Sequence, residues 1–403
     1  MKRDKESFVR RISQAFVERG LGDFEYDSRE FCLRFGDGES AWVANLTNVF
    51  DEYCAAKNDA QRAEIVGRFT RAYDPTEETD AALDDVLPEL LPRVRELGYF
   101  GVLALHVQIE RAGNKTASKE PYRPPPRLPI ADHLGAIVVH DREDSISDLT
   151  ANDYERWGVD FEHVFDKAQA NLWRRSEEPF ERQRSGLYLS PWRDNHDASR
   201  LLLTDKIREL DVDGDPVAMV PNRDFLLVTG SMDAKGLEAM ADICDELREA
   251  PRPMSFVPVR LGDNDEWTTF LRDVSPAVRA RFARLRVLDR ARDYDEQKSL
   301  LDALHEKQGH DEFVATFMVF EDKETGQLGS LTTWSEGVRA LLPATDRVAF
   351  TSADDEAQVV PWHTVVKHVS KLMKPVDGLY PERFQVAKFP SRKVLAAMGG
   401  ERI

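Results

Sequence analysis

Residues 216–230, PVAMVPNRDFLLVTG, constrain the fold more than any other stretch of the chain. Two apolar runs in this stretch are separated by the polar residues Asn222, Arg223 and Asp224. Short apolar runs that are bounded by turn residues are typical of buried β-strands, and Asn tolerates the backbone of a tight turn. The stretch therefore predicts a central hairpin with a charged turn at residues 222–224.

Helical and strand patterns alternate along the rest of the chain without a fixed repeat. Periodicity predicts helices at residues 6–19, 48–71, 161–172 and 235–249, and a short or kinked helix at 84–97. Strands are predicted at residues 24–26, 30–35, 41–46, 99–110, 134–140, 184–191, 198–204, 254–260, 312–320, 327–333 and 347–351. This order predicts an α+β fold in which small mixed sheets each pack against helices.

A chain of 403 residues exceeds what one hydrophobic core usually serves, so two to three domains are expected. The proline-rich stretch at 111–129 is expected to be an extended connection, with a docking peptide as the alternative. The high charge of residues 263–308 predicts a solvated helical linker. The expected parts are an N-terminal α+β domain (1–110), the Pro-rich connection (111–129), a central α+β domain (130–262), the linker (263–308) and a C-terminal α+β unit (309–403).

The charge of the chain restricts its partners. A net charge of -18 argues against nucleic acid or an anionic membrane surface, because both would repel the protein at long range. The three cysteines, Cys32, Cys54 and Cys244, have no metal-ligand or redox-motif spacing, which favours a reducing compartment. No stretch of 18 apolar residues occurs. We therefore expect a cytoplasmic protein.

No familiar catalytic or metal-binding motif is complete. The carboxylates of Asp211, Asp213 and Asp215 begin like a calcium loop, but Pro216 and Asn222 stand where that loop needs glycine and glutamate. Neither a nucleophile elbow nor a phosphate loop occurs. The sequence therefore predicts no metal and no cofactor, and it leaves open whether the protein is an enzyme.

Three histidines lie next to aspartates in the sequence, namely His133, His140 and His196. Neighbours on a strand point to opposite faces, whereas a general base needs its partner across a pocket. Capping or surface roles are therefore expected for these histidines.

Two polar segments are candidate binding residues. Charges between apolar strands are costly when they are buried alone, so Arg223 and Asp224 must reach solvent, find a partner or face a ligand. An ordinary turn with Asn222 at its start is the favoured interpretation. The loop at 192–195 is the second candidate, because Trp192, Arg193 and Asp194 combine an aromatic ring with charges, as recognition surfaces do.

The chain resembles the uncharacterised YtpQ-like family of bacterial cytoplasmic proteins over roughly residues 1–270. The resemblance rests on FEYD at 24–27 leading into FCLR at 31–34, NLTN at 45–48, RLP at 127–129, AQANL at 168–172 and VPNRD at 220–224. It implies a cytosolic α+β protein and adds no mechanism.

Two functions remain open at this point. The acidic charge and the missing catalytic motifs favour a non-catalytic binding protein with a basic protein partner, of the inhibitor or immunity type. The alternative is a hydrolase or transferase whose site lies near the turn 222–224 and the loop 192–195. A pocket in which these residues meet a histidine or a second carboxylate would favour the alternative. The oligomeric state is not predicted.

Overall fold

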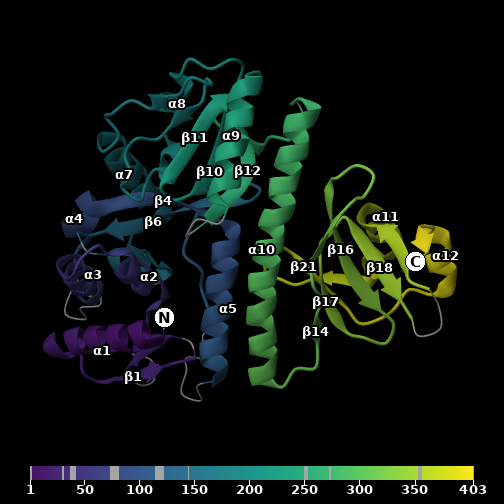
Figure 1. The fold of residues 1–403 in the computed structure, drawn as a ribbon, viewed down its shortest axis with the longest axis horizontal. Helices are drawn as coiled ribbons and strands as arrows, with labels where there is room; N and C mark the ends of the chain where they lie inside the picture. Colours follow the sequence, from purple (N-terminus) through teal and green to yellow (C-terminus); the bar gives the residue numbers. More distant parts are fainter. Residues whose placement is uncertain are drawn as a thin grey trace.

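The structure, a computed structural model, confirms the α+β class: helices account for 42% and strands for 27% of the chain. It describes residues 2–29, 31–36, 42–72, 81–113, 122–143, 145–248, 253–271, 274–352 and 356–402. Figure 1 shows an N-terminal part, a central part and a C-terminal lobe, with one long helix between the central part and the lobe.

The N-terminal part is a three-stranded antiparallel sheet covered by helices. The first helix, α1 (Lys2–Glu18), buries Phe8, Ile12 and Phe16 completely, as its predicted apolar face requires. Its partners are β1 (Phe24–Asp27), β2 (Cys32–Phe35), β3 (Trp42–Asn45), α2 (Thr47–Ala55) and α3 (Asp59–Arg71). The turn predicted at 36–38 lies mostly outside the described residues.

The central part holds two sheets. The smaller one pairs β4 (Leu90–Glu96) with β6 (Leu134–Asp141), and β5 (Leu128–Ala131) and β7 (Ile146–Asp148) both pair with β6. The larger sheet has the order β13-β12-β10-β11-β9-β8, from β8 (Glu181–Arg182), β9 (Tyr188–Leu189), β10 (Pro216–Asn222), β11 (Phe225–Gly230), β12 (Pro253–Leu261) and β13 (Trp267–Thr269). The predicted hairpin is confirmed as β10 and β11, and every residue of β10 is buried between its two neighbouring strands.

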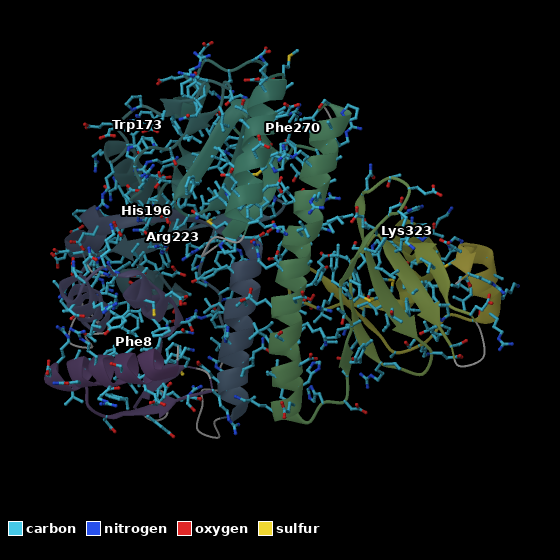
Figure 2. The ribbon with its side chains drawn as sticks, in the orientation of Figure 1. Phe8, Trp173, His196, Arg223, Phe270 and Lys323 are labelled. Atoms are coloured by element: carbon cyan, nitrogen blue, oxygen red, sulfur yellow. The ribbon has the colours of Figure 1, made fainter. Side chains whose placement is uncertain are left out.

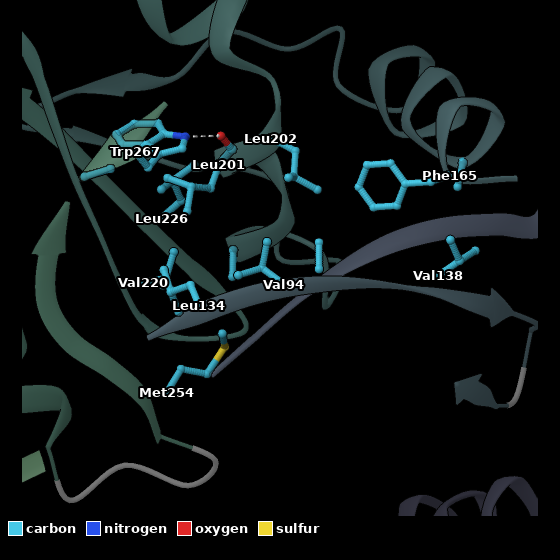
Figure 3. Packing of buried hydrophobic residues seen from close by; sticks show 14 of the residues in the cluster. Val94, Leu134, Val138, Phe165, Leu201, Leu202, Val220, Leu226, Met254 and Trp267 are labelled. Atoms are coloured by element: carbon cyan, nitrogen blue, oxygen red, sulfur yellow. Dashed lines mark hydrogen bonds between the residues drawn. The ribbon is translucent and has the colours of Figure 1, made fainter. Parts of the chain in front are cut away.

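Helices close the core between these sheets. In Figure 3 the apolar side chains of both sheets meet there, and Trp267 Nε1 donates a hydrogen bond of 3.2 Å to the carbonyl of Leu201. A capping box of Thr150 and Asp153 begins the helix Ala151–Trp157. The surrounding helices are α4 (Leu83–Val86), η2 (Leu87–Glu89), α6 (Ala151–Trp157), α7 (Phe161–Arg174), η3 (Ala198–Leu202), α8 (Thr204–Arg208) and α9 (Ala234–Leu247).

Three predicted elements differ in type over all or part of their length. The strand expected at 99–110 belongs to helix α5 (Leu97–Gly113). The short helix expected within 84–97 is present only at its start, as α4 and η2, and residues 90–96 form strand β4. Different faces of α5 meet separate clusters, because Phe100 packs on the small sheet and Leu105 packs against Leu301. Burial on two sides gives a continuous apolar run, which periodicity cannot distinguish from a buried strand. The strand expected at 198–204 is mostly the 3-10 helix η3.

The segment expected to be a solvated linker contains the buried helix α10 (Pro276–Gln308), which lies beside α5 in Figure 1. Its apolar residues are spread around its circumference, because α10 packs on the large sheet and on the C-terminal lobe as well as on α5. Polar side chains also attach it to the lobe: Tyr294 Oη donates to the carbonyl of Glu382 at 2.8 Å, and Gln297 Nε2 donates to that of Pro381 at 2.9 Å.

The C-terminal lobe contains two small sheets. The strand predicted at 312–320 is interrupted and contributes β14 to one sheet and β15 to the other. Strands Met318–Glu321 and Leu328–Ser335 pair with each other in antiparallel orientation. The elements are β14 (Phe313–Val314), β15 (Met318–Glu321), β16 (Leu328–Ser335), β17 (Ala340–Pro343), β18 (Arg347–Thr351), β19 (Gln358–Pro361), α11 (Trp362–Val369), η4 (Ser370–Leu372), β20 (Met373–Pro375), β21 (Arg383–Val386), α12 (Arg392–Met398) and β22 (Glu401–Arg402).

Candidate functional site

The two segments singled out in the sequence lie against each other. Ala198 N, just after the loop 192–197, donates a hydrogen bond of 3.1 Å to the carbonyl of Arg223. Ser190, just before the loop, exchanges two hydrogen bonds of 3.0 Å with Leu226 on β11. In Figure 2, His196 and Arg223 accordingly lie in the same region of the central part. The fold therefore places the loop 192–197 at the tip of the central hairpin.

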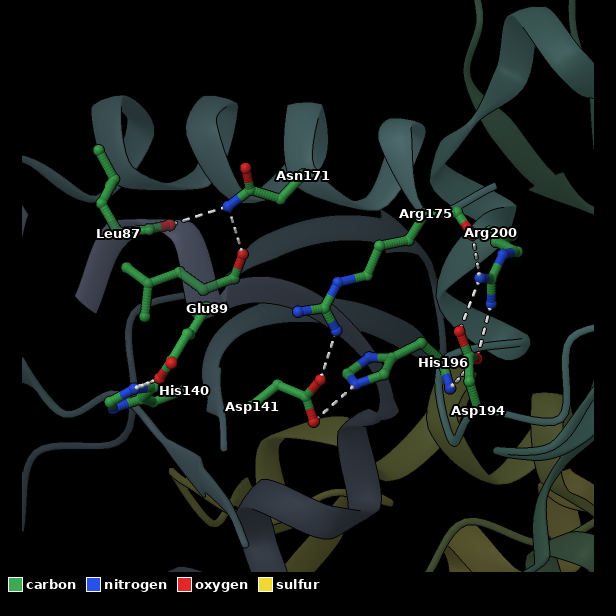
Figure 4. Close-up of polar contacts among 10 residues, drawn as sticks. Leu87, Glu89, His140, Asp141, Asn171, Arg175, Asp194, His196 and Arg200 are labelled. Atoms are coloured by element: carbon green, nitrogen blue, oxygen red, sulfur yellow. Dashed lines mark hydrogen bonds and ion pairs between the residues drawn. The ribbon is translucent and has the colours of Figure 1, made fainter. Parts of the chain in front are cut away.

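A buried arginine fixes this loop. Arg200 has no exposed surface, and its two terminal nitrogens each lie 2.8 Å from an oxygen of Asp194 (Figure 4). Its guanidinium also lies 4.0 Å from the centre of the Trp192 ring. Burial acts to raise the pKa of Asp194, but the hydrogen bonds and charge of Arg200 outweigh it and hold that pKa below its ordinary value. Asp194 and Trp192 thus have structural partners, while Arg193 is exposed.

His196 is buried, with 1% of its surface exposed, rather than capping or at the surface as expected. Its Nε2 lies 3.4 Å from Oδ1 of Asp141, and Oδ2 of Asp141 accepts a hydrogen bond of 2.6 Å from Arg175 (Figure 4). His133 and His140 are also buried. Among the described residues, no hydroxyl or thiol is hydrogen-bonded to the His196 ring. The arrangement that would favour a hydrolase or transferase here is therefore incomplete.

The turn 222–224 is only partly open to solvent. Asn222 is 7% exposed, and its Oδ1 accepts a hydrogen bond of 2.7 Å from the backbone nitrogen of Asp224. Arg223 keeps 23% of its side chain exposed, with Nε 3.6 Å from Oδ1 of Asp224. Asn222 thus shapes the turn as predicted, and Arg223 lies beside its sequence neighbour Asp224.

A cavity of about 390 Å³ lies where the small sheet, α5, α10 and the C-terminal lobe meet. Neither the loop 192–195 nor the turn 222–224 lines it, and sequence reasoning missed it, because its residues are far apart in the chain. A second cavity, of about 350 Å³, lies beside α7. The larger cavity is lined by Arg95, Glu96, Gly98, Tyr99, Val102, Pro253, Met254, Arg292, Asp293, Glu296 and Tyr380.

Three carboxylates at this cavity share one guanidinium. Arg292 Nη2 lies 3.1 Å from Oε2 of Glu96, 2.7 Å from Oδ1 of Asp289 and 3.0 Å from Oδ1 of Asp293. Phe256 N also donates a hydrogen bond of 3.3 Å to Asp289 Oδ2. Oxygens of the three acids lie within 4.8 Å of one another, close enough to share a metal ion. Arg292 supplies the positive charge that an ion would otherwise bring to them.

One arginine does not balance these acids. Burial, with the negative charge of Asp293, raises the pKa of Asp289 to about 7 against the opposing charge of Arg292. Burial and the two aspartates raise the pKa of Glu96 well above its ordinary value, and burial raises that of Asp293. The cluster therefore holds protons near neutral pH, and an additional positive charge would displace them. Perturbed acids in a cavity are a frequent mark of a functional site.

None of the described helices combines the length and apolar composition needed to cross a membrane. No family model, no curated protein and no solved structure matches the chain, so the resemblance to the YtpQ-like family stays a prediction.

Proposed function

We propose that the protein is a non-catalytic binding protein that receives a cationic group, such as a lysine or arginine side chain of a basic protein partner, in the cavity beside Glu96, Asp293 and Glu296. The observation that carries this proposal is that three carboxylates share one guanidinium: Asp289 is buried, and Glu96 and Asp293 line the wall of the cavity. A second cation would offset the remaining negative charge and favour the ionised acids.

The walls of the cavity suit such a group. Its volume of about 390 Å³ accommodates a long basic side chain, and Tyr99 and Tyr380 line it with aromatic rings. The net charge of -18 favours rapid encounter with a basic partner. Affinity and specificity would come from the cavity, and the surrounding charge would raise the association rate.

The test is a calorimetric titration with a tetralysine peptide at ~0.15 M salt, where long-range attraction is screened. Binding is expected to release protons, because a bound cation lowers the raised pKa values of Glu96, Asp289 and Asp293. Proton release appears as a dependence of the measured enthalpy on the ionisation enthalpy of the buffer. Affinity should therefore increase between pH 6 and pH 8.

Matched variants locate the binding. Glu96→Gln and Glu296→Gln should each lower the affinity about tenfold, the equivalent of ~1.4 kcal/mol for a lost charge contact. Glu238→Gln removes the same charge from an exposed position on α9 and should have little effect. If all three variants lose the same affinity, or if binding releases no protons, the peptide binds through the net charge of the protein and not in the cavity.

A further inference from the structure

Strand β4 carries two arginines on one face of a largely apolar strand. Arg93 pairs with Ile137 and Arg95 pairs with Gly135 in the antiparallel register with β6. Residues two apart on a strand point to the same side. Arg93 is only 5% exposed, so most of its side chain, including Nε, lies inside the protein.

Two other arginines among the described residues are buried, and both have hydrogen-bond acceptors. Arg383 donates to Gln297 Oε1 at 2.5 Å and to the carbonyls of Ala315, Leu341 and Tyr294 at 2.7, 3.0 and 3.1 Å. Arg200 is bound to Asp194, as described above.

Arg93 differs from both. Its buried Nε has no acceptor within the described part of the chain, and the same is true of Arg95 Nε. Arg95 lies over the ring of Tyr99, at 4.4 Å from its centre. A buried guanidinium without an acceptor is costly unless something else supplies the negative charge.

A third arginine is brought to this place by η3. Two consecutive residues of η3 contact the hairpin turn and strand β4. Ala198 N donates a hydrogen bond of 3.1 Å to the carbonyl of Arg223 in the turn, and Ser199 Oγ accepts one of 3.2 Å from Val94 N on β4. The hairpin turn is thereby fixed beside the strand segment that contains Arg93 and Arg95.

The electrostatics agree with this placement. Burial, with the positive charges of Arg95 and Arg223, lowers the pKa of Arg93 to about 10 against the opposing effect of Asp148. Asp148 already accepts a hydrogen bond of 2.6 Å from Tyr99 Oη. Positive charge therefore accumulates at this point of an otherwise acidic protein.

We propose that Arg93, Arg95 and Arg223 form a binding site for the phosphoryl group of a ligand. Planar guanidinium groups match the oxygens of a phosphate, and the double negative charge of a phosphate monoester balances several arginines better than one carboxylate does. Of the three arginines, Arg95 also lines the cavity of about 390 Å³, beside Tyr99. The proposal uses different charged groups from the carboxylate cluster and does not depend on it.

The test measures thermal stability and calorimetric binding with inorganic phosphate, with chloride at equal ionic strength and acetate as reference anions. Phosphate should stabilise the protein more than either. Arg93→Met and Arg223→Met should each weaken phosphate binding at least about tenfold, the equivalent of ~1.4 kcal/mol for a lost charge-assisted contact. Arg182→Met, which changes an exposed residue of β8, should bind phosphate as the unaltered protein does.

The stability without phosphate separates a ligand-binding arginine from a structural one. Arg93→Met should be at least as stable as the unaltered protein, because it removes a largely buried charge whose Nε has no acceptor among the described residues. Arg383→Met should be less stable, because several acceptors lose their donor. The proposal is overturned if phosphate stabilises no more than chloride does, or if phosphate binding survives both Arg93→Met and Arg223→Met. If acetate stabilises the protein as much as phosphate does, the site binds carboxylate ligands and the assignment to phosphate is wrong.

Discussion

Arg292 Nη2 lies 2.7 Å from Oδ1 of Asp289, one turn away on α10, and the same nitrogen reaches Glu96 at the end of β4. This one guanidinium therefore connects the long helix to the small sheet. Its surroundings contain more acid than base, so the stability of the contact depends on pH.

The first prediction concerns Asp289 and pH. The pKa of its carboxyl is about 7 in the folded protein and 3.8 ordinarily, so between these pH values the folded state holds a proton that the unfolded state has lost. The free energy of unfolding contributed by this group therefore falls as the pH rises from about 4 to 7. Asp289→Asn should flatten this fall, as measured by urea unfolding across that range. An unchanged slope would contradict the assignment.

The second prediction concerns Arg292 itself. Arg292→Met leaves three acids, of which Asp289 is buried, without their shared cation. We expect a loss of up to about 3 kcal/mol at pH 8, since removing one partner of a buried pair is strongly destabilising. The loss should be smaller at pH 5, because Asp289, whose pKa is raised to about 7, is protonated there. Arg281→Met, which removes ion pairs to Asp242 and Asp245 nearer the surface, should change stability by less than about 1 kcal/mol at either pH. Equal effects of the two substitutions would contradict the charge imbalance.

The third prediction concerns the loop 192–197. Arg200→Met removes both hydrogen bonds to Asp194 and leaves that carboxylate without its buried partner, at an expected loss of about 3 kcal/mol. The loop should then open, and trypsin should cleave after the exposed Arg193 faster than in the unaltered protein. Arg182→Met, at an exposed position, serves as the control. Unchanged cleavage at Arg193 would show that other contacts hold the loop.

The fourth prediction tests whether α10 is part of the folded core. Leu301 is 5% exposed and packs against Leu105 of α5, so Leu301→Ala should lower the free energy of unfolding by about 2–4 kcal/mol. Arg284→Ala changes an exposed position of the same helix and should stay within about 0.5 kcal/mol. Similar small effects of both would indicate a loosely attached helix.

Local patterns predicted the central hairpin from its turn residues and several helices from their single buried face. They failed at α5, and at α10 they predicted the helix but not its packing. The apolar residues of both helices face more than one layer. Only the tertiary arrangement decides such cases.

The candidate sites show the same division. The neighbouring segments at 192–195 and 222–224 were found from composition, whereas the cavity was missed because Glu96, Asp293 and Tyr380 meet only in the folded chain. The sequence did contain one sign of a polar site near β4, because Arg93 and Arg95 alternate with apolar residues in LLPRVRE. Charges at buried strand positions require a partner or a ligand.

The attachment of α10 to the C-terminal lobe makes the cavity a point of thermodynamic linkage. Tyr294 and Gln297 hold the backbone at Glu382 and Pro381, directly after Tyr380, which forms part of the cavity wall. Any ligand whose affinity depends on the position of Tyr380 will favour one placement of the lobe. By reciprocity, a molecule that binds the lobe and shifts this segment will change the affinity for that ligand by the same factor.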